Sequence, residues 1–159
     1  MVRWYWTKGR SPALTVTLEE LARLYLVEGA AENVRGDVAF CQAIHETGWF
    51  GYGGQVQWWQ NNYCGLGATN PVDGQPIPGG ETFNTAQIGV RAHIQHLCAY
   101  LDREVFDLAH PLVDPRYTTV IGLPDKRAET WVELNGKWAF PGTTYGQSIL
   151  AKWHEMRGA

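Results

Sequence analysis

The sequence contains one glutamate whose position favours acid catalysis. Glu46 stands in the last turn of a predicted helix that begins at Gly36 and is stopped by Gly48, and Trp49 and Phe50 follow it. The negative end of the helix dipole and the neighbouring apolar rings both disfavour a charged carboxylate, so they raise its pKa. A carboxyl group that keeps its proton near neutral pH can act as a general acid. The position equally fits a glutamate that ends a helix and faces water.

Amide groups and glycines are concentrated in the run from residue 60 to residue 67, Gln-Asn-Asn-Tyr-Cys-Gly-Leu-Gly. Amides bind sugar hydroxyls and acetamido groups, and glycine allows a ligand to approach the backbone closely. We therefore expect Asn62, Tyr63 and Gly65 to bind substrate along a groove. A polar turn fits the same run.

The chain holds 8 Trp, 7 Tyr and 5 Phe, and several of these rings adjoin glycines instead of following a helical pattern. Trp58 and Trp59 are neighbours, so on an extended segment one ring can be buried while the other stacks on a sugar. Trp138 and Phe140 supply further rings just before the last predicted helix. The phenol of Tyr145, which begins that helix, could hydrogen-bond a reacting group. Packing alone also explains each ring.

Asp73 and Glu81 are candidates for a second catalytic carboxylate. Both lie in the segment 49–83, where glycine, asparagine, glutamine and proline predominate and which could fold over a cleft. Two carboxylates on either side of a glycosidic bond are the usual machinery of a glycoside hydrolase, and their separation distinguishes retention from inversion.

The histidine and cysteine spacings do not favour a metal site or a disulfide framework. His93 and His96 are three residues apart on a predicted helix, but no second histidine follows His45 at the spacing of a zinc protease. We expect histidines in the core or the groove and no metal or cofactor. The three cysteines have no CxxC spacing, so we expect free thiols.

Length and charge limit the possible partners. A chain of 159 residues, 45% of them hydrophobic, fits one compact domain. The 13 basic and 16 acidic side chains give a net charge of −3, which argues against a nucleic-acid binder with a basic footprint. No apolar run reaches about 18 residues, and residues 1–10 lack the apolar core of a secretory signal. We expect a monomer with neither nucleic acid nor membrane as a partner.

The hydrophobic pattern predicts mostly helices. Residues 1–16 show no periodicity and form an expected irregular lead-in, followed by one domain over residues 17–159. Thr17, Leu18, Glu19 and Glu20 form a capping box, which starts an amphipathic helix that ends near Gly29.

Three more helical segments follow the glutamate helix. The segment from Thr85 to Leu101 is apolar around most of its circumference, so it should be the central buried helix. A short helix is expected over 126–135, after an irregular stretch from 110 to 124, and the last helix over 145–156. The glycine-rich segment 49–83 predicts a small β-lobe between the helices.

Four of these segments resemble the glucosaminidase domain of glycoside hydrolase family 73. The similarity lies in Ala-Ile-His-Glu-Thr-Gly-Trp-Phe (43–50), Asn-Asn-Tyr-Cys-Gly-Leu-Gly-Ala (61–68), Phe-Asn-Thr leading into Gly-Val-Arg-Ala-His-Ile-Gln-His-Leu (83–97), and Trp-Ala-Phe-Pro-Gly-Thr-Thr-Tyr-Gly (138–146). It extends from about residue 17 to residue 156. It implies a mainly α, lysozyme-like (α+β) fold with a small β-lobe and a cleft between the lobes.

The resemblance also implies an activity. Members of this family cleave the β-1,4 bond on the reducing side of N-acetylglucosamine in bacterial peptidoglycan, whose glycan strands would be the partner of this chain. Glu46 falls on the catalytic acid of the family. Tyr145, or Trp138 in its place, falls near an aromatic residue beside the reaction centre. Asn62, Tyr63 and Gly65 fall on the cleft wall.

Several alternatives stay open at this point. Neither Asp73 nor Glu81 lies in a motif that aligns with the family, so the 2-acetamido oxygen of the substrate could attack the anomeric carbon instead. A lytic transglycosylase with one glutamate would leave an anhydro ring, and a binding module would hold the glycan without cutting it. We expect the protein to act at the cell wall, either as a released phage lysin or as a domain of a longer secreted protein.

Overall fold

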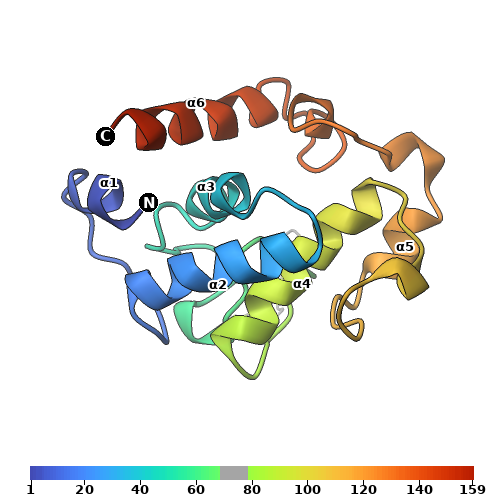
Figure 1. The fold of residues 1–159 in the computed structure, drawn as a ribbon, viewed down its shortest axis with the longest axis horizontal. Coiled ribbons are helices and arrows are strands. Elements are labelled where there is room, and N and C mark those ends of the chain that lie inside the picture. The colour runs from blue at the N-terminus through green and yellow to red at the C-terminus, as the bar shows by residue number, and fades with distance from the viewer. Residues whose placement is uncertain (69–78) are drawn as a thin grey trace.

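The computed structural model describes residues 1–68 and 79–159, and this part of the chain is mainly helical (Figure 1). It contains no β-strand in these residues, where one isolated bridge joins Asn135 to Ala139. No helix in the described ranges is both long and apolar enough to span a membrane. The α-helices of the described residues are α1 (Val2–Trp6), α2 (Leu18–Ala31), α3 (Gly36–Glu46), α4 (Ala86–Tyr100), α5 (Tyr117–Ile121) and α6 (Tyr145–Gly158). The same ranges contain the short 3-10 helices η1 (Trp58–Gln60), η2 (Val105–Asp107), η3 (Pro124–Lys126) and η4 (Val132–Leu134).

Helix α3 lies at the centre of the fold. It packs against α2 on one side and α6 on the other, and α4 crosses α2 (Figure 1). Gly36 allows the first contact, because a Cβ there would lie only 2.0 Å from the carbonyl oxygen of Tyr25 on α2. Gly89 likewise lets α4 approach the loop at Asn61, whose carbonyl oxygen would be 1.8 Å from a Cβ. The mainly α-helical class is therefore confirmed.

The small β-lobe expected over 49–83 is not found in the described residues. Before residue 69 the chain makes bends, turns and η1 in place of strands. Left-handed backbone interrupts the alternation of side chains that a strand requires. Eight described residues of this segment have positive φ: Trp49, Phe50, Tyr52, Gly53, Asn61, Gly65, Gly67 and Gly80.

The first helix, α1, lies inside the segment 1–16 that we expected to be irregular. Trp4 and Tyr5 are almost completely buried, and their rings pack against Trp49 and Phe50. The Tyr5 hydroxyl donates a hydrogen bond to the Trp49 carbonyl oxygen at 2.6 Å. These contacts come from residues more than 40 positions away, so the local sequence pattern carries no sign of them.

The predicted start of α2 is correct, although only half of the capping box forms. Thr17 Oγ1 accepts a hydrogen bond from the Glu20 backbone N–H at 3.1 Å. The Glu20 carboxylate does not reach back, because it makes two hydrogen bonds with Arg23 one turn further along. Helix α4 begins at the predicted position and is capped, with Thr85 Oγ1 accepting from the Ile88 N–H at 3.2 Å.

Between α4 and α6 the prediction is less accurate. Helix α5 lies within the stretch 110–124 that we expected to be irregular, and the 3-10 helices η3 and η4 replace one short helix over 126–135. Pro124 begins η3, where its missing N–H costs no hydrogen bond. This region leads the chain to Trp138 beside α3.

Candidate active site

Glu46 is the last residue of α3, as predicted. The helix ends in a Schellman motif, in which the Trp49 N–H donates to the Ile44 carbonyl oxygen at 2.8 Å and the Gly48 N–H to that of His45 at 3.5 Å. Gly48 has φ +58°, which glycine adopts without strain. The motif stops the helix at a fixed position and thereby fixes the direction of the Glu46 side chain.

Two neutral donors bind one oxygen of Glu46. The indole Nε1–H of Trp138 donates to Oε1 at 2.9 Å, and the hydroxyl of Tyr145 donates to the same oxygen. The other oxygen, Oε2, has no hydrogen-bond partner among the described residues, and Glu46 lines a cleft. A protonated Glu46 would thus carry its proton on Oε2.

Burial raises the pKa of Glu46, while the hydrogen bonds from Tyr145 and Trp138 act in the opposite direction. The net change is upward, because no described residue forms an ion pair with this carboxylate. We expected Trp49 and Phe50 to remove water from Glu46. Their rings instead pack on α1, and the aromatic residues that bond to the carboxylate come from 92 and 99 positions later in the chain.

Behind Tyr145, a chain of buried hydrogen bonds leads away from the cleft. Gln42 Nε2 donates to the Tyr145 hydroxyl oxygen at 2.8 Å, and Gln42 Oε1 lies 3.0 Å from His93 Nε2. His93 Nδ1 lies 2.8 Å from the Tyr25 hydroxyl. Burial lowers the pKa of His93 to about 3, so the ring is neutral.

The donor and the acceptor can be assigned for each of these buried hydrogen bonds. The amide oxygen of Gln42 can only accept, so His93 carries its proton on Nε2, and its Nδ1 accepts from Tyr25. Each donor therefore points toward Glu46: Tyr25 to His93, His93 to Gln42, Gln42 to Tyr145, and Tyr145 to the carboxylate. Hydrogen bonds arranged in series polarise one another, which strengthens the last donor.

Trp138 is held in place by rings of α4. Its ring centroid lies 4.9 Å from that of His96 and 5.2 Å from that of Tyr100. His96 is itself fixed by the buried Asp114, whose Oδ2 lies 2.7 Å from Nδ1. Both donors to Glu46 thus depend on α4, since Tyr145 is connected to it through Gln42 and His93.

The cleft beside Glu46 has a volume of about 560 Å³. Asn62, Gly65 and Trp138, three of the predicted substrate-binding residues, line it. The Asn62 side chain is committed to the loop: Nδ2 donates to the Leu66 carbonyl oxygen at 2.8 Å, and Oδ1 accepts from the Leu66 N–H at 3.0 Å. It therefore holds the loop that forms the cleft wall in place. Among the described lining residues, Glu46 is the sole carboxylate.

Other predicted site residues lie elsewhere. Tyr63 is buried in the hydrophobic core and does not line the cleft. Trp58 and Trp59 are both about half exposed, on η1, and Phe140 is 91% exposed; none of the three lines the cleft.

The two candidates for a second carboxylate are not brought to Glu46 in the described residues. Glu81 lies against Gly67, where a Cβ would be 3.0 Å from its Oε1, and it does not line the cleft. Asp73 lies outside the described residues, in the segment that follows the cleft residue Ala68.

Sequence reasoning missed Gln42 and Tyr25. Gln42 stands four residues before Glu46, so the two side chains lie on the same face of α3. That spacing was a usable signal for Gln42. The link from His93 to Tyr25 joins residues 68 positions apart, and no local pattern indicates it.

The three histidines considered as metal ligands, His45, His93 and His96, do not converge on one point. His45 Nδ1 lies 3.3 Å from Lys152 Nζ, whereas His93 and His96 take part in the separate contacts described above. The described part of the chain contains no group of three or more histidine, cysteine, aspartate or glutamate side chains arranged to hold a metal ion. All three cysteines are buried and free.

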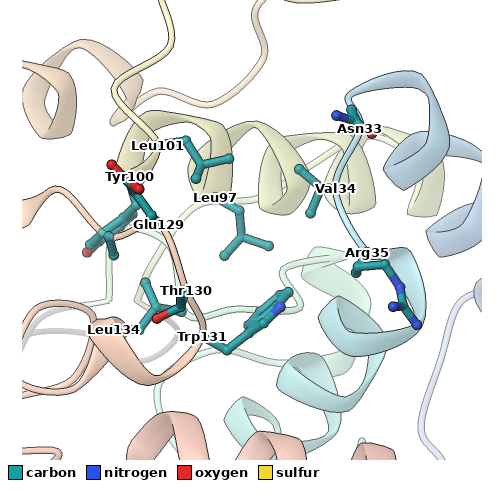
Figure 2. A pocket seen from close by; sticks show the side chains of 11 residues that line it. Asn33, Val34, Arg35, Leu97, Tyr100, Leu101, Glu129, Thr130, Trp131 and Leu134 are labelled. Atoms are coloured by element: carbon teal, nitrogen blue, oxygen red, sulfur yellow. The ribbon is translucent and has the colours of Figure 1, made fainter.

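A separate hollow of about 270 Å³ lies between the α2–α3 loop, the end of α4 and η4 (Figure 2). Val34, Leu97 and Trp131 border it, with Arg35 and Glu129 at its edges. No predicted site residue lines this hollow, so the cleft at Glu46 is the candidate active site.

The chain is similar to known proteins over most of its length. A curated protein of Borreliella burgdorferi strain B31, described only as uncharacterized, is 36% identical over 121 residues, which are 75% of this chain and 53% of the relative. The chain thus spans about half the length of the curated relative that it matches. No solved structure matches it. The family model Glucosaminidase, described as mannosyl-glycoprotein endo-beta-N-acetylglucosaminidase, matches residues 22–157. The chain therefore belongs to the glucosaminidase family, glycoside hydrolase family 73.

Proposed function

We propose that this protein is a peptidoglycan hydrolase that cleaves the β-1,4 bond on the reducing side of N-acetylglucosamine, with Glu46 as general acid. One observation carries the proposal: both hydrogen-bond donors to Glu46 bind Oε1, which leaves Oε2 at the cleft to hold and deliver a proton. The raised pKa of Glu46 keeps that proton available at higher pH than for an ordinary glutamate. Family membership supports the substrate class.

In this mechanism, Glu46 Oε2 donates its proton to the glycosidic oxygen as the bond to the anomeric carbon breaks. The carboxyl group becomes a carboxylate in the same step. Tyr145 and Trp138 already donate to Oε1, so the new negative charge meets two preorganised donors without rearrangement.

The group that attacks the anomeric carbon is the 2-acetamido oxygen of the substrate. Its attack forms a cyclic oxazolinium, which water opens to give a new reducing end and regenerate the acetamido group. The Glu46 carboxylate takes the proton from that water and returns to its starting state. This route is supported by the described lining of the cleft, in which Glu46 is the sole carboxylate. Asp73 and Glu81 are the candidates for a second carboxylate if the acetamido group does not act.

Digestion of purified cell walls by the protein and its Glu46→Gln variant tests the proposal. We expect the protein to release fragments with N-acetylglucosamine at the reducing end, and the variant to release them at least about 10²-fold more slowly. The exposed Glu19→Gln variant should behave like the unchanged protein. Anhydro-muramyl ends in the mass spectrum would instead identify a lytic transglycosylase. Binding to walls without release of any sugar would identify a glycan-binding module.

Variants of the two remaining acids test the route. If the acetamido group attacks, Asp73→Asn and Glu81→Gln keep most of their activity, and a substrate whose acetamido group is replaced by hydroxyl is not cleaved. If Asp73→Asn loses as much activity as Glu46→Gln, the attacking group is Asp73 and not the acetamido group.

A further inference from the structure

A second polar pocket of about 280 Å³ adjoins the cleft of Glu46. The two share Cys64, Gly65, Ala68 and Trp138, so they form one continuous depression with Trp138 between them. A ligand that extends beyond Glu46 past Trp138 would therefore enter this second pocket.

The second pocket is lined by three cations: Arg116, Lys126 and Lys137. Within residues 1–68 and 79–159, none of them forms an ion pair. Lys126 Nζ donates to the Lys137 carbonyl oxygen at 2.6 Å, and Lys137 Nζ donates to that of Arg127. These bonds orient the two ammonium groups without neutralising them. In a chain of net charge −3, three such cations in one pocket form a local site for an anion.

His96 lines the floor of the same pocket. The residue is only 7% exposed, and the buried carboxylate of Asp114 holds its Nδ1 at 2.7 Å. Its second nitrogen, Nε2, has no hydrogen-bond partner among the described residues. Because Asp114 accepts the hydrogen bond from Nδ1, Nε2 is the ring nitrogen left for a ligand in the pocket.

We propose that this pocket binds a carboxylate group carried by a muramic acid residue of the glycan next to the bond that is cut. The inference rests on the proposed function and adds a determinant of specificity to it. N-acetylglucosamine carries no acid group, whereas muramic acid carries a lactyl group, either as a free carboxylate or extended by a peptide with carboxylates of its own. Arg116 would make the main contact, since its side chain has no other hydrogen bond among the described residues and its guanidinium matches a carboxylate in geometry.

Arg116→Gln tests the proposal through its effect on different substrates. On peptide-bearing glycan strands we expect KM to rise about tenfold with kcat unchanged, because a hydrogen bond to a charged group is lost. On a chito-oligosaccharide, which has no carboxylate, we expect no change. The matched control is Arg23→Gln on α2, which removes the same charge far from the pocket and should change neither constant.

Glycan stripped of its peptides distinguishes the two sources of the carboxylate. A tenfold effect of Arg116→Gln that persists on stripped glycan assigns the contact to the lactyl group, and one that disappears assigns it to the peptide. An equal rise of KM on the chito-oligosaccharide would overturn the proposal, as would the same rise in Arg23→Gln.

Direct binding separates this proposal from the proposed function. We expect a soluble muramoyl dipeptide to shift the ring resonances of His96 in Glu46→Gln, with about tenfold weaker binding once Arg116→Gln is added. The same dipeptide with its carboxylates amidated should not bind. If the acid dipeptide binds but the unchanged protein does not cleave walls, the proposed hydrolase activity is refuted and the pocket is not. If the protein cleaves walls but binds the acid and the amidated dipeptide equally, the proposed carboxylate pocket is refuted and the activity is not.

Discussion

Glu28 and Glu46 are two glutamates near the centre of the same fold, and their surroundings drive their pKa values in opposite directions. Glu28 on α2 is 1% exposed, and its carboxylate accepts from Arg91 Nε at 2.9 Å and Nη2 at 3.1 Å, and from Gln87 at 2.8 Å. Burial by itself raises the pKa of Glu28, but the bonds and charge of its partners outweigh burial, so the pKa is lowered. For Glu46 burial prevails, and the pKa is raised.

The difference lies in the kind of donor and not in the number of hydrogen bonds. Arg91 brings a full positive charge, whereas Tyr145 and Trp138 bring dipoles only. A cation beside a buried carboxylate makes a permanent ion pair that holds α2 to α4. Neutral donors fix the position of the carboxyl group and leave its proton in place, which acid catalysis requires.

The largest expected effect is the loss of turnover in Glu46→Gln. The amide keeps the oxygen that Tyr145 and Trp138 bind but cannot donate an acidic proton, so we expect activity to fall about 10²- to 10⁴-fold. The rate of release of reducing ends measures this, and circular dichroism checks that the helices remain. Residual activity within tenfold of the unchanged protein would show that Glu46 is not the acid.

The same variant should be more stable than the unchanged protein at neutral pH. Because the pKa of Glu46 is raised in the folded state, the unfolded chain loses this proton first as the pH rises above about 4.5. Stability therefore decreases as pH rises from there through the folded pKa, and the Glu46→Gln variant, which has no proton to lose at this position, would not share that loss. Urea unfolding at pH 4 and pH 7 measures it, and a variant that is less stable at pH 7 would contradict the raised pKa.

Glu28→Gln should show the converse, a loss of stability with normal chemistry. It leaves Arg91, 16% exposed, without its carboxylate, and we expect the free energy of unfolding to fall by about 3 kcal/mol. Urea unfolding measures the change, and activity per folded molecule should stay normal. Glu20→Gln, which breaks the exposed pair with Arg23, is the control and should leave the free energy of unfolding nearly unchanged.

Acid should remove the contribution of Glu28 in the unchanged protein. Its folded pKa lies below the ordinary value of 4.5, so its stabilisation is fully present above that pH and is lost as the pH falls through the folded pKa. The difference in stability between the protein and Glu28→Gln should therefore shrink in acid. A difference that does not depend on pH would show that packing, and not the ion pair, is lost.

Tyr145→Phe should have an intermediate effect and identify the role of the neutral donors. One donor to Oε1 is removed, so the carboxylate formed in the reaction is less stable and kcat should fall about 10- to 100-fold. The pKa of Glu46 should rise further, which moves the loss of activity at high pH to still higher pH. Tyr117→Phe removes another buried phenol, bonded to the Arg103 carbonyl oxygen, and should leave the pH profile unchanged. A downward movement in Tyr145→Phe would contradict the assigned direction of the bond.

The sequence was sufficient to predict that Glu46 lies at the end of its helix, but not which residues surround its side chain. The end of α3 is a local property, because Gly48 and the residues on either side of it form the Schellman motif. The caps at Thr17 and Thr85 are local in the same sense. The rings around Glu46 are not: Trp49 follows it in sequence but packs on α1, while Trp138 arrives through α5, η3 and η4, which local periodicity predicts poorly. For Tyr145 and Trp138 the family resemblance supplied what periodicity could not.

The smallest expected effect, in Gln42→Leu, tests whether the chain behind Tyr145 acts on Glu46. The leucine keeps the volume but removes the donor to the Tyr145 oxygen, so the Tyr145 hydroxyl becomes a weaker donor. We expect the high-pH limb of kcat to move upward by less than about half a pH unit, in the same direction as in Tyr145→Phe but by less. Gln95→Leu is the matched control: it removes an equally buried glutamine of α4, which binds the backbone at Val113 and Asp114, and should lower stability without moving the limb. Equal pH profiles for Gln42→Leu and Gln95→Leu would show that the hydrogen bonds from Tyr25 to Gln42 contribute to packing only and do not act on the pKa of Glu46.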